Sequence, residues 1–223
     1  MRAGVITFPG SNCDRDAAVA LAAAGAKVVP LWHADTELPK LDLIVLPGGF
    51  AHGDYLRCGA IAARAPVMSE VIRRAAAGVA VLGICNGFQI LAEAGLVPGA
   101  VISNAGLKFI CRPVDLEVVS TDCAFTAGYG QGQTIRLPIA HHDGNYVCGE
   151  DDLRRLEDED RVAFRYVDNP NGSLAAIAGV LGTGRNVLGL MPHPEHAVDP
   201  DVGPTGGQPL FASLLSSLVG ADA

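Results

Sequence analysis

Residues 79–89 read VAVLGICNGFQ, an apolar run followed by a cysteine between two glycines and then by a helical pattern. The run predicts a buried strand over residues 79–82, and the pattern after it predicts a helix over residues 86–94 that stops at Gly95. A nucleophile between two glycines at a strand-to-helix turn is the pattern of a nucleophile elbow, here with Cys85 in place of serine. The N-terminus of the following helix would lower the pKa of this thiol. A buried structural cysteine between two turn glycines is the alternative.

The rest of the first half alternates strand-like and helical segments in the same way. Strands are predicted over residues 3–8, 27–32 and 43–46, and helices over residues 14–24 and 66–77. Continuous Val/Ile/Leu strands that alternate with helices are typical of a parallel sheet covered on both faces. We therefore expect an α/β fold with a flavodoxin-like parallel or mixed sheet flanked by helices.

The second half has a different rhythm, which predicts an antiparallel extension of the sheet. Strand-like runs separated by Gly, Pro and Asn turns cover residues 109–120, 134–140, 162–167, 174–180 and 186–190. Residues 182–184 (GTG) predict a hairpin between the last two runs, and residues 210–219 predict a closing helix. No repeat, low-complexity tract or linker-like composition divides the chain, so we expect one domain over residues 1–223.

Composition and charge argue against a disordered, a nucleic-acid-binding and a membrane-spanning protein. The chain is 49% hydrophobic and 18% charged, which excludes intrinsic disorder. A net charge of −8 disfavours a nucleic-acid partner. Half of this charge lies between Glu150 and Arg161, where acids and arginines four residues apart predict a solvated helix face. No apolar run reaches the ~20 residues that cross a bilayer, and no signal-peptide pattern opens the chain. We therefore expect a cytoplasmic protein without a membrane partner.

The cysteines show no spacing that indicates a metal site. The six cysteines lie at least twelve residues apart, so no zinc-type pair of neighbouring cysteines exists. A disulfide framework is not expected in a chain of this length without a secretion signal. The sequence predicts no metal ligand set, and most of these cysteines are expected to be small buried hydrophobes.

A cysteine nucleophile needs a general base and a group that orients this base. His193 stands between Pro192 and Pro194, which stiffen the backbone around it. Glu195 follows two residues later, so in an extended segment its side chain points the same way and can fix the imidazole tautomer. An incidental histidine in a proline-rich surface turn is the alternative, and the elbow at Cys85 disfavours it. We predict a triad of nucleophile Cys85, base His193 and orienting residue Glu195.

A third element is the loop after the predicted strand at residues 43–46, which reads Pro47-Gly48-Gly49-Phe50. Loops at the carboxyl edge of an open parallel sheet gather where ligands bind. Their backbone N–H groups, together with the N–H of Asn86, can line an oxyanion hole. An ordinary glycine turn is the alternative.

Taken together, the motifs GICNGFQ (83–89), PGGF (47–50) and MPHPE (191–195) make the chain similar to the class I (triad) glutamine amidotransferases. Within that family the resemblance extends nearly end to end to the glutaminase subunits that act in de novo purine (IMP) biosynthesis. It includes the segments FPGSNCD (8–14), GDYLRCGA (53–60), KFICR (108–112) and IAH (139–141). The resemblance implies the class I amidotransferase fold.

The resemblance also implies a reaction. Cys85 would attack the side-chain amide of L-glutamine, His193 would transfer protons, and Glu195 would orient His193. A glutamyl thioester would form, ammonia would leave, and water would release glutamate. The residues that the resemblance assigns to the oxyanion or to substrate binding are Gly48, Gly49, Asn86, Gln89 and His141.

By the same resemblance, the ammonia passes to a large synthetase subunit that also binds a small accessory subunit. The synthetase would use ATP and Mg²⁺ to convert formylglycinamide ribonucleotide to formylglycinamidine ribonucleotide, so no cofactor is expected in this chain. None of the three lysines follows a G-x-x-x-x-G sequence, and no G-x-G-x-x-G occurs, which agrees with an ATP site elsewhere.

The chain departs from the family pattern at its expected rim. Ala51-His52 stands where Ser-Tyr is more common, and His196 follows Glu195 where arginine is common. These departures concern contacts with a partner. Two alternatives stay open: a related cysteine hydrolase of the elbow-cysteine superfamily, and a non-catalytic module on the same fold. Many of those hydrolases place a histidine directly after the cysteine, where this chain has Asn86.

Overall fold

The strands of the first half form the parallel part of one sheet in the computed structural model, which describes residues 1–219. They are, in chain order, β1 (Arg2–Thr7), β2 (Lys27–Trp32), β3 (Leu43–Leu46) and β4 (Ala80–Ile84). With β11 (Val187–Leu190) they form the order β2-β1-β3-β4-β11, and every neighbouring pair is parallel. Flavodoxin-like sheets have this strand order. The predicted parallel core is confirmed.

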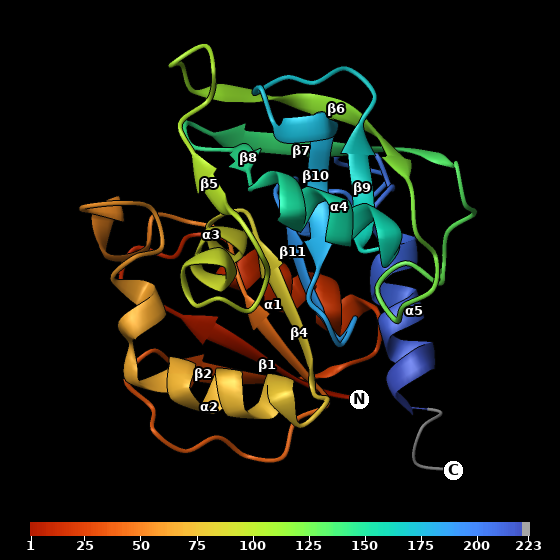
Figure 1. The fold of residues 1–223 in the computed structure, drawn as a ribbon. Coiled ribbons are helices and arrows are strands. Elements are labelled where there is room, and N and C mark those ends of the chain that lie inside the picture. Colours follow the sequence, from red (N-terminus) through yellow and green to blue (C-terminus); the bar gives the residue numbers. More distant parts are fainter. Residues whose placement is uncertain (220–223) are drawn as a thin grey trace.

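Helices cover both faces of the parallel strands. They are α1 (Asp14–Ala23), α2 (Pro66–Ala76), α3 (Asn86–Glu93) and α5 (Gln208–Val219). In the view of Figure 1, α2 and α3 lie in front of these strands and α1 lies behind them, next to α5. All residues of β3 and β4 are buried, because both faces are covered, and this explains their continuous apolar sequences. Within residues 1–219, no helix is both long and apolar enough to cross a membrane.

The second half extends the same sheet with antiparallel strands. These are β6 (Ile110–Val118), β7 (Thr134–His141), β9 (Val162–Tyr166) and β10 (Ile177–Leu181). They follow β11 in the order β10-β9-β6-β7 and complete a nine-stranded mixed sheet (Figure 1). The predicted antiparallel extension is confirmed, and so is the hairpin at residues 182–184, which joins β10 to β11.

Two short strands lie outside the predicted elements. β5 (Ala100–Ile102) pairs with β8 (Asn145–Val147) in a separate antiparallel ribbon. Each strand has three residues, too few for an alternating pattern to stand out in the sequence. The strand predicted over residues 174–180 begins later, because Ala175 has a left-handed φ of 51° within a 3-10 turn, Leu174–Ala176.

The acidic segment forms helix α4 (Glu150–Asp158), as predicted, but its ion pairs differ from the predicted ones. They join residues three apart, Asp151–Arg154 and Asp152–Arg155. Residues three and four apart are both neighbours on a helix, so the solvated face is the same with either spacing. The helix ends before Glu159, which therefore pairs with Arg161 at 2.7 Å instead of with a residue of the helix.

Candidate active site

Cys85 lies where β4 passes directly into α3. Its backbone has φ 50° and ψ −106°, a strained conformation for a residue with a side chain. Gly87 lets α3 approach β3, because a Cβ at this position would lie 1.9 Å from the carbonyl oxygen of Leu46. A Cβ on Gly83 would lie 2.6 Å from the carbonyl oxygen of Gly87. Close backbone contacts therefore require both glycines of the predicted elbow.

His193 and Glu195 lie in the loop after β11, at the same edge of the sheet as Cys85. His193 Nδ1 lies 2.6 Å from Glu195 Oε1, and both side chains are almost completely buried. The His193 N–H donates to the carbonyl oxygen of Pro138 at 2.9 Å, which holds the loop against β7. Burial alone would lower the pKa of His193, but Glu195 and the neighbouring Cys85 sulfur hold this pKa well above its ordinary value. The fold thus brings the three residues of the predicted triad together.

The loop after β3 supplies the two predicted oxyanion glycines. Gly48 lies against the triad, since a Cβ there would be 2.7 Å from His193 Cε1. Gly49 forms an antiparallel bridge with Ser11, and a Cβ on Gly49 would be 2.7 Å from the Ser11 Cα. Asn86 is the first residue of α3, so its N–H is one of the donors that a helix leaves unpaired. These backbone groups lie next to the Cys85 elbow, as an oxyanion site requires.

The side chains of Asn86 and Gln89 connect separate parts of the site. Asn86 Oδ1 accepts a hydrogen bond from the N–H of Ala51 at 3.0 Å. Asn86 Nδ2 donates to Asp54 Oδ1 at 3.1 Å and to Gln89 Oε1 at 2.7 Å. Gln89 Nε2 in turn donates to the carbonyl oxygen of Asp143 at 2.6 Å. The amide of Gln89 is therefore engaged within the protein, and its contact with glutamine stays a prediction.

A cavity of about 30 Å³ adjoins Cys85 and includes His141 in its wall. This volume is about that of one water molecule. His141, predicted to bind substrate, is buried and held by its Nδ1, which lies 3.0 Å from Asn104 Oδ1. Burial lowers the pKa of His141 to about 4, so the imidazole is neutral near pH 7.

Three further residues of the cavity wall, Asp54, Cys58 and Asp143, had no role in the sequence prediction. Cys58 Sγ donates to Asp143 Oδ2 at 2.9 Å. Burial raises the pKa values of Asp54 and Cys58. Burial also opposes ionisation of Asp143, but hydrogen bonds from groups including Cys58 and His142 outweigh it and lower the Asp143 pKa. Asp54 and Cys58 both lie in the GDYLRCGA segment, and the resemblance of that segment to the family was the available sequence signal for them.

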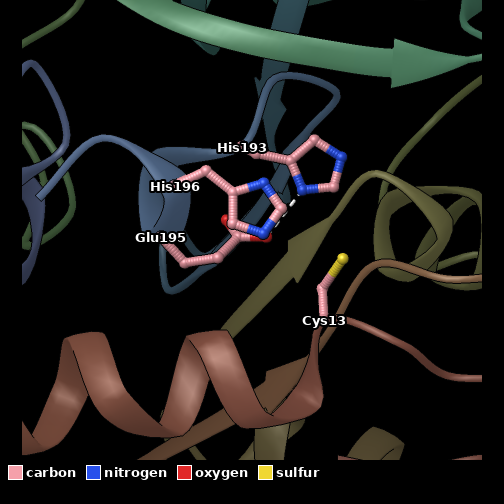
Figure 2. A group of neighbouring side chains, drawn as sticks. All are labelled: Cys13, His193, Glu195 and His196. Carbon is pink, nitrogen blue, oxygen red and sulfur yellow. Dashed lines mark hydrogen bonds and ion pairs between the residues drawn. The ribbon is translucent and has the colours of Figure 1, made fainter. Parts of the chain in front are cut away.

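Cys13 also lies at the site, although the sequence analysis gave it no role; the FPGSNCD segment that contains it was the available signal. It directly precedes α1, and Figure 2 shows its sulfur facing the group formed by His193, Glu195 and His196. The side chains of Cys13 and Cys85 thus lie near the same histidine.

Comparison with known proteins shows which family the chain belongs to. The family described as the CobB/CobQ-like glutamine amidotransferase domain matches residues 1–206. Phosphoribosylformylglycinamidine synthase subunit PurQ of Cereibacter sphaeroides is 60% identical over 219 residues, which cover 98% of this chain and 99% of the relative. The chain belongs to the PurQ branch of the glutamine amidotransferases. PurQ of Zymomonas mobilis is 58% identical over 217 residues, covering 96% of this chain and 98% of the relative.

Solved structures support the same assignment. The structure of PurLQS from Thermotoga maritima contains a chain with a TM-score of 0.91 and 47% identity, covering 97% of this chain and 98% of that one. A glutamine amidotransferase from Thermotoga maritima matches with a TM-score of 0.63 and 17% identity, covering 99% and 97%. At that identity the second match shows the fold alone. The predicted family and the predicted amidotransferase fold are confirmed.

Proposed function

We propose that this amidotransferase chain hydrolyses L-glutamine through Cys85, His193 and Glu195 and delivers the ammonia to a synthetase subunit. The acceptor reaction is the ATP-dependent conversion of formylglycinamide ribonucleotide to formylglycinamidine ribonucleotide in purine biosynthesis, in the cytoplasm. The names of the PurQ relatives support this reaction. The observation that carries the proposal is the 2.6 Å contact of His193 with Glu195 beside a cysteine at a strained strand-to-helix turn.

The proposed chemistry follows from the positions of these groups. The Cys85 thiolate attacks the side-chain carbonyl carbon of glutamine, and the N–H groups of Gly49 and Asn86 stabilise the oxyanion. His193 donates a proton to the departing nitrogen, which leaves as ammonia, and a glutamyl thioester remains on Cys85. His193 then accepts a proton from water, whose oxygen attacks the thioester. Glutamate leaves, and the Cys85 thiolate beside protonated His193 is restored.

The cavity is too small for this substrate in the described conformation. It holds about one water molecule, whereas a glutamine side chain needs several times that volume. We infer that the part of the wall that includes Phe50 and Asp54 moves when glutamine binds. Phe50, Tyr55 and Leu56 are exposed apolar residues in and next to this segment. A partner surface that covers them can favour the open position of the loop.

The proposed partners are the large synthetase subunit and the small accessory subunit of the same complex. The PurLQS structure, which contains a similar chain, supports this composition. ATP and Mg²⁺ are assigned to the synthetase, and this chain supplies only ammonia.

The test is synthesis by the reconstituted complex with Cys85→Ala and, as a matched control, Cys111→Ala at an exposed cysteine. Cys85→Ala is expected to abolish glutamine-dependent synthesis and to retain synthesis from added ammonium. Cys111→Ala is expected to retain both activities. Glutamine-dependent synthesis by Cys85→Ala would refute the nucleophile assignment.

A labelling experiment separates the alternatives. An electrophilic glutamine analogue is expected to form an adduct on Cys85, which peptide mass spectrometry locates. Release of product from peptides but not from glutamine would favour a related cysteine hydrolase. Absence of an adduct in the assembled complex would favour a non-catalytic module.

A further inference from the structure

Four side chains with metal-binding atoms meet beside the proposed triad. They are Cys13, His193, Glu195 and His196, and one potential ligand atom from each lies within 4.8 Å of the others. Cys13 comes from the start of α1, whereas the other three come from the loop after β11, about 180 residues later (Figure 2). The separation along the chain explains why cysteine spacing does not reveal the cluster.

The cluster has one side open to solvent. Cys13, His193 and Glu195 are buried, while the His196 side chain is 36% exposed and offers a route for a small ion. The rings of His193 and His196 are parallel, with centroids 4.8 Å apart and planes inclined by 3°. Glu195 Oε1 lies 2.6 Å from His193 Nδ1 and 3.9 Å from His196 Nε2, so the same carboxylate oxygen is close to both imidazole rings.

Two buried polar atoms of this cluster, His193 Nε2 and Glu195 Oε2, have no hydrogen-bond partner among the described residues. Glu195 Oε2 is inaccessible to solvent and makes no hydrogen bond within the described chain. A buried carboxylate oxygen normally accepts a hydrogen bond or coordinates a cation. The Glu195 side chain is fully buried, so this oxygen has an unused capacity to bind a cation that reaches the cluster.

The donor atoms indicate which cation fits. One thiolate, two imidazoles and one carboxylate form a set that zinc accepts in tetrahedral sites. Thiolate and imidazole select zinc over magnesium or calcium, which prefer oxygen ligands. Zinc–ligand distances of about 2.0–2.3 Å place tetrahedral ligand atoms roughly 3.3–3.8 Å apart. The ligand atoms, which lie within 4.8 Å of one another, therefore have to rearrange slightly, and the 2.6 Å contact of His193 with Glu195 has to open.

We propose that Cys13, His193, Glu195 and His196 form an inhibitory Zn²⁺ site. The cation displaces the proton shared by His193 Nδ1 and Glu195, and this proton and the proton of the Cys13 thiol are both released to solvent. With His193 bound to the cation, Glu195 no longer orients the ring for proton transfer at Cys85. Binding of the cation does not depend on the proposed function, whereas inhibition rests on it.

The binding test uses Co²⁺ as a spectroscopic substitute for Zn²⁺ on the full chain. A thiolate ligand gives a sulfur-to-cobalt charge-transfer band in the near ultraviolet, and tetrahedral Co²⁺ gives intense visible bands. We expect one Co²⁺ per chain and displacement of Co²⁺ by Zn²⁺. Cys13→Ser is expected to remove the charge-transfer band, and His196→Arg is expected to weaken metal binding by at least ~10-fold through loss of a ligand.

Two further variants identify the thiol that binds the metal. Cys85→Ser and the exposed-site control Cys111→Ser are both expected to retain the band. A band that persists in Cys13→Ser, or that disappears in Cys85→Ser, overturns the site as proposed. Because His196 lies at the surface, His196→Arg tests the site even if Cys13→Ser fails to fold.

The activity test then measures inhibition in the complex. Zn²⁺ is expected to inhibit glutamine-dependent synthesis but not ammonium-dependent synthesis, and His196→Arg is expected to need ~10-fold more Zn²⁺ for half-inhibition. Equal sensitivity of wild type and His196→Arg would overturn the inhibitory role. The Co²⁺ binding test does not need glutaminase activity. Its result therefore separates an error in the proposed metal site from an error in the proposed glutaminase activity.

Discussion

Gly48→Ala tests whether the position of His193 determines the rate of hydrolysis. The added Cβ would lie 2.7 Å from His193 Cε1 and 3.3 Å from Cys13 Sγ. Carbon atoms in contact are normally about 3.5–4.0 Å apart, so the imidazole has to retreat by about 1 Å. Gly48 does not have a left-handed φ, so the alanine backbone itself is not strained. The substitution therefore acts through the contact with the ring.

The ring cannot retreat without losing its alignment. His193 Nδ1 is 2.6 Å from Glu195 Oε1, and the ring stacks on His196 at 4.8 Å. A misplacement of about 1 Å can cost roughly 10²-fold in rate, which corresponds to about 2.7 kcal/mol of activation free energy. We expect glutamine-dependent kcat to fall by this factor. Overpacking costs about 1–3 kcal/mol of stability, which leaves a typical domain folded.

The assay is glutamate release by the assembled complex, with ammonium-dependent synthesis as the internal control. Gly106→Ala is the matched variant, because within the described structure a Cβ there would meet nothing within 4 Å. We expect Gly106→Ala to match wild type, and ammonium-dependent synthesis to be unchanged in both variants. A folded Gly48→Ala protein with the wild-type rate of glutamate release would refute the assignment of His193 as the base.

Three other substitutions test separate contacts. Asn86→Ala leaves the buried N–H of Ala51 without its acceptor, which costs about 1–3 kcal/mol of stability. The melting temperature should fall and glutamate release should slow. Unchanged values would contradict the role of Asn86 in holding the loop at Ala51. His141 has a pKa of about 4 in the folded protein and 6.5 in the unfolded chain. Between pH 7 and pH 5 the unfolded chain therefore binds a proton at His141 that the folded protein does not bind. This difference lowers the free energy of unfolding by about 2 kcal/mol over that pH range. Denaturant titrations at both pH values should show a smaller loss in His141→Gln, and an equal loss would argue against a buried neutral imidazole. Gly87→Ala places a Cβ 1.9 Å from the Leu46 carbonyl oxygen, a backbone atom, and should lower the melting temperature more than Gly48→Ala does, whereas an unchanged melting temperature would show that α3 can move away.

Most of the fold was predictable because its signals are local. The strands Lys27–Trp32 and Leu43–Leu46 have the predicted bounds. All residues of Leu43–Leu46 are buried, and apolar residues covered on both faces give a continuous run between turn residues. The antiparallel half was recognised from its turns, above all the hairpin at residues 182–184. The ribbon of β5 and β8 was not predicted, because its three-residue strands depend on tertiary pairing rather than on a pattern.

The site was predictable where one segment carries the geometry. Cys85 between its glycines, and Glu195 two residues after His193, are local patterns with a direct structural meaning. The position of Cys13 is not local, because the fold brings it to a loop about 180 residues later in the chain. The hydrogen bond from the Ala51 N–H to Asn86 joins elements 35 residues apart and has no sequence signature either.

Asn86 connects the loop that lines the cavity to the proposed oxyanion site. Its backbone N–H faces the proposed oxyanion, while its side chain binds Ala51 and Asp54 in the loop that closes the cavity. Opening this loop for glutamine therefore breaks contacts of the residue that also belongs to the oxyanion site. Each such hydrogen bond contributes about 0.5–1.5 kcal/mol, so opening has a modest cost that partner contacts at the exposed Tyr55 and Leu56 can offset. We therefore expect the described position of the loop, in which these side-chain hydrogen bonds are formed, to differ from the position that admits glutamine.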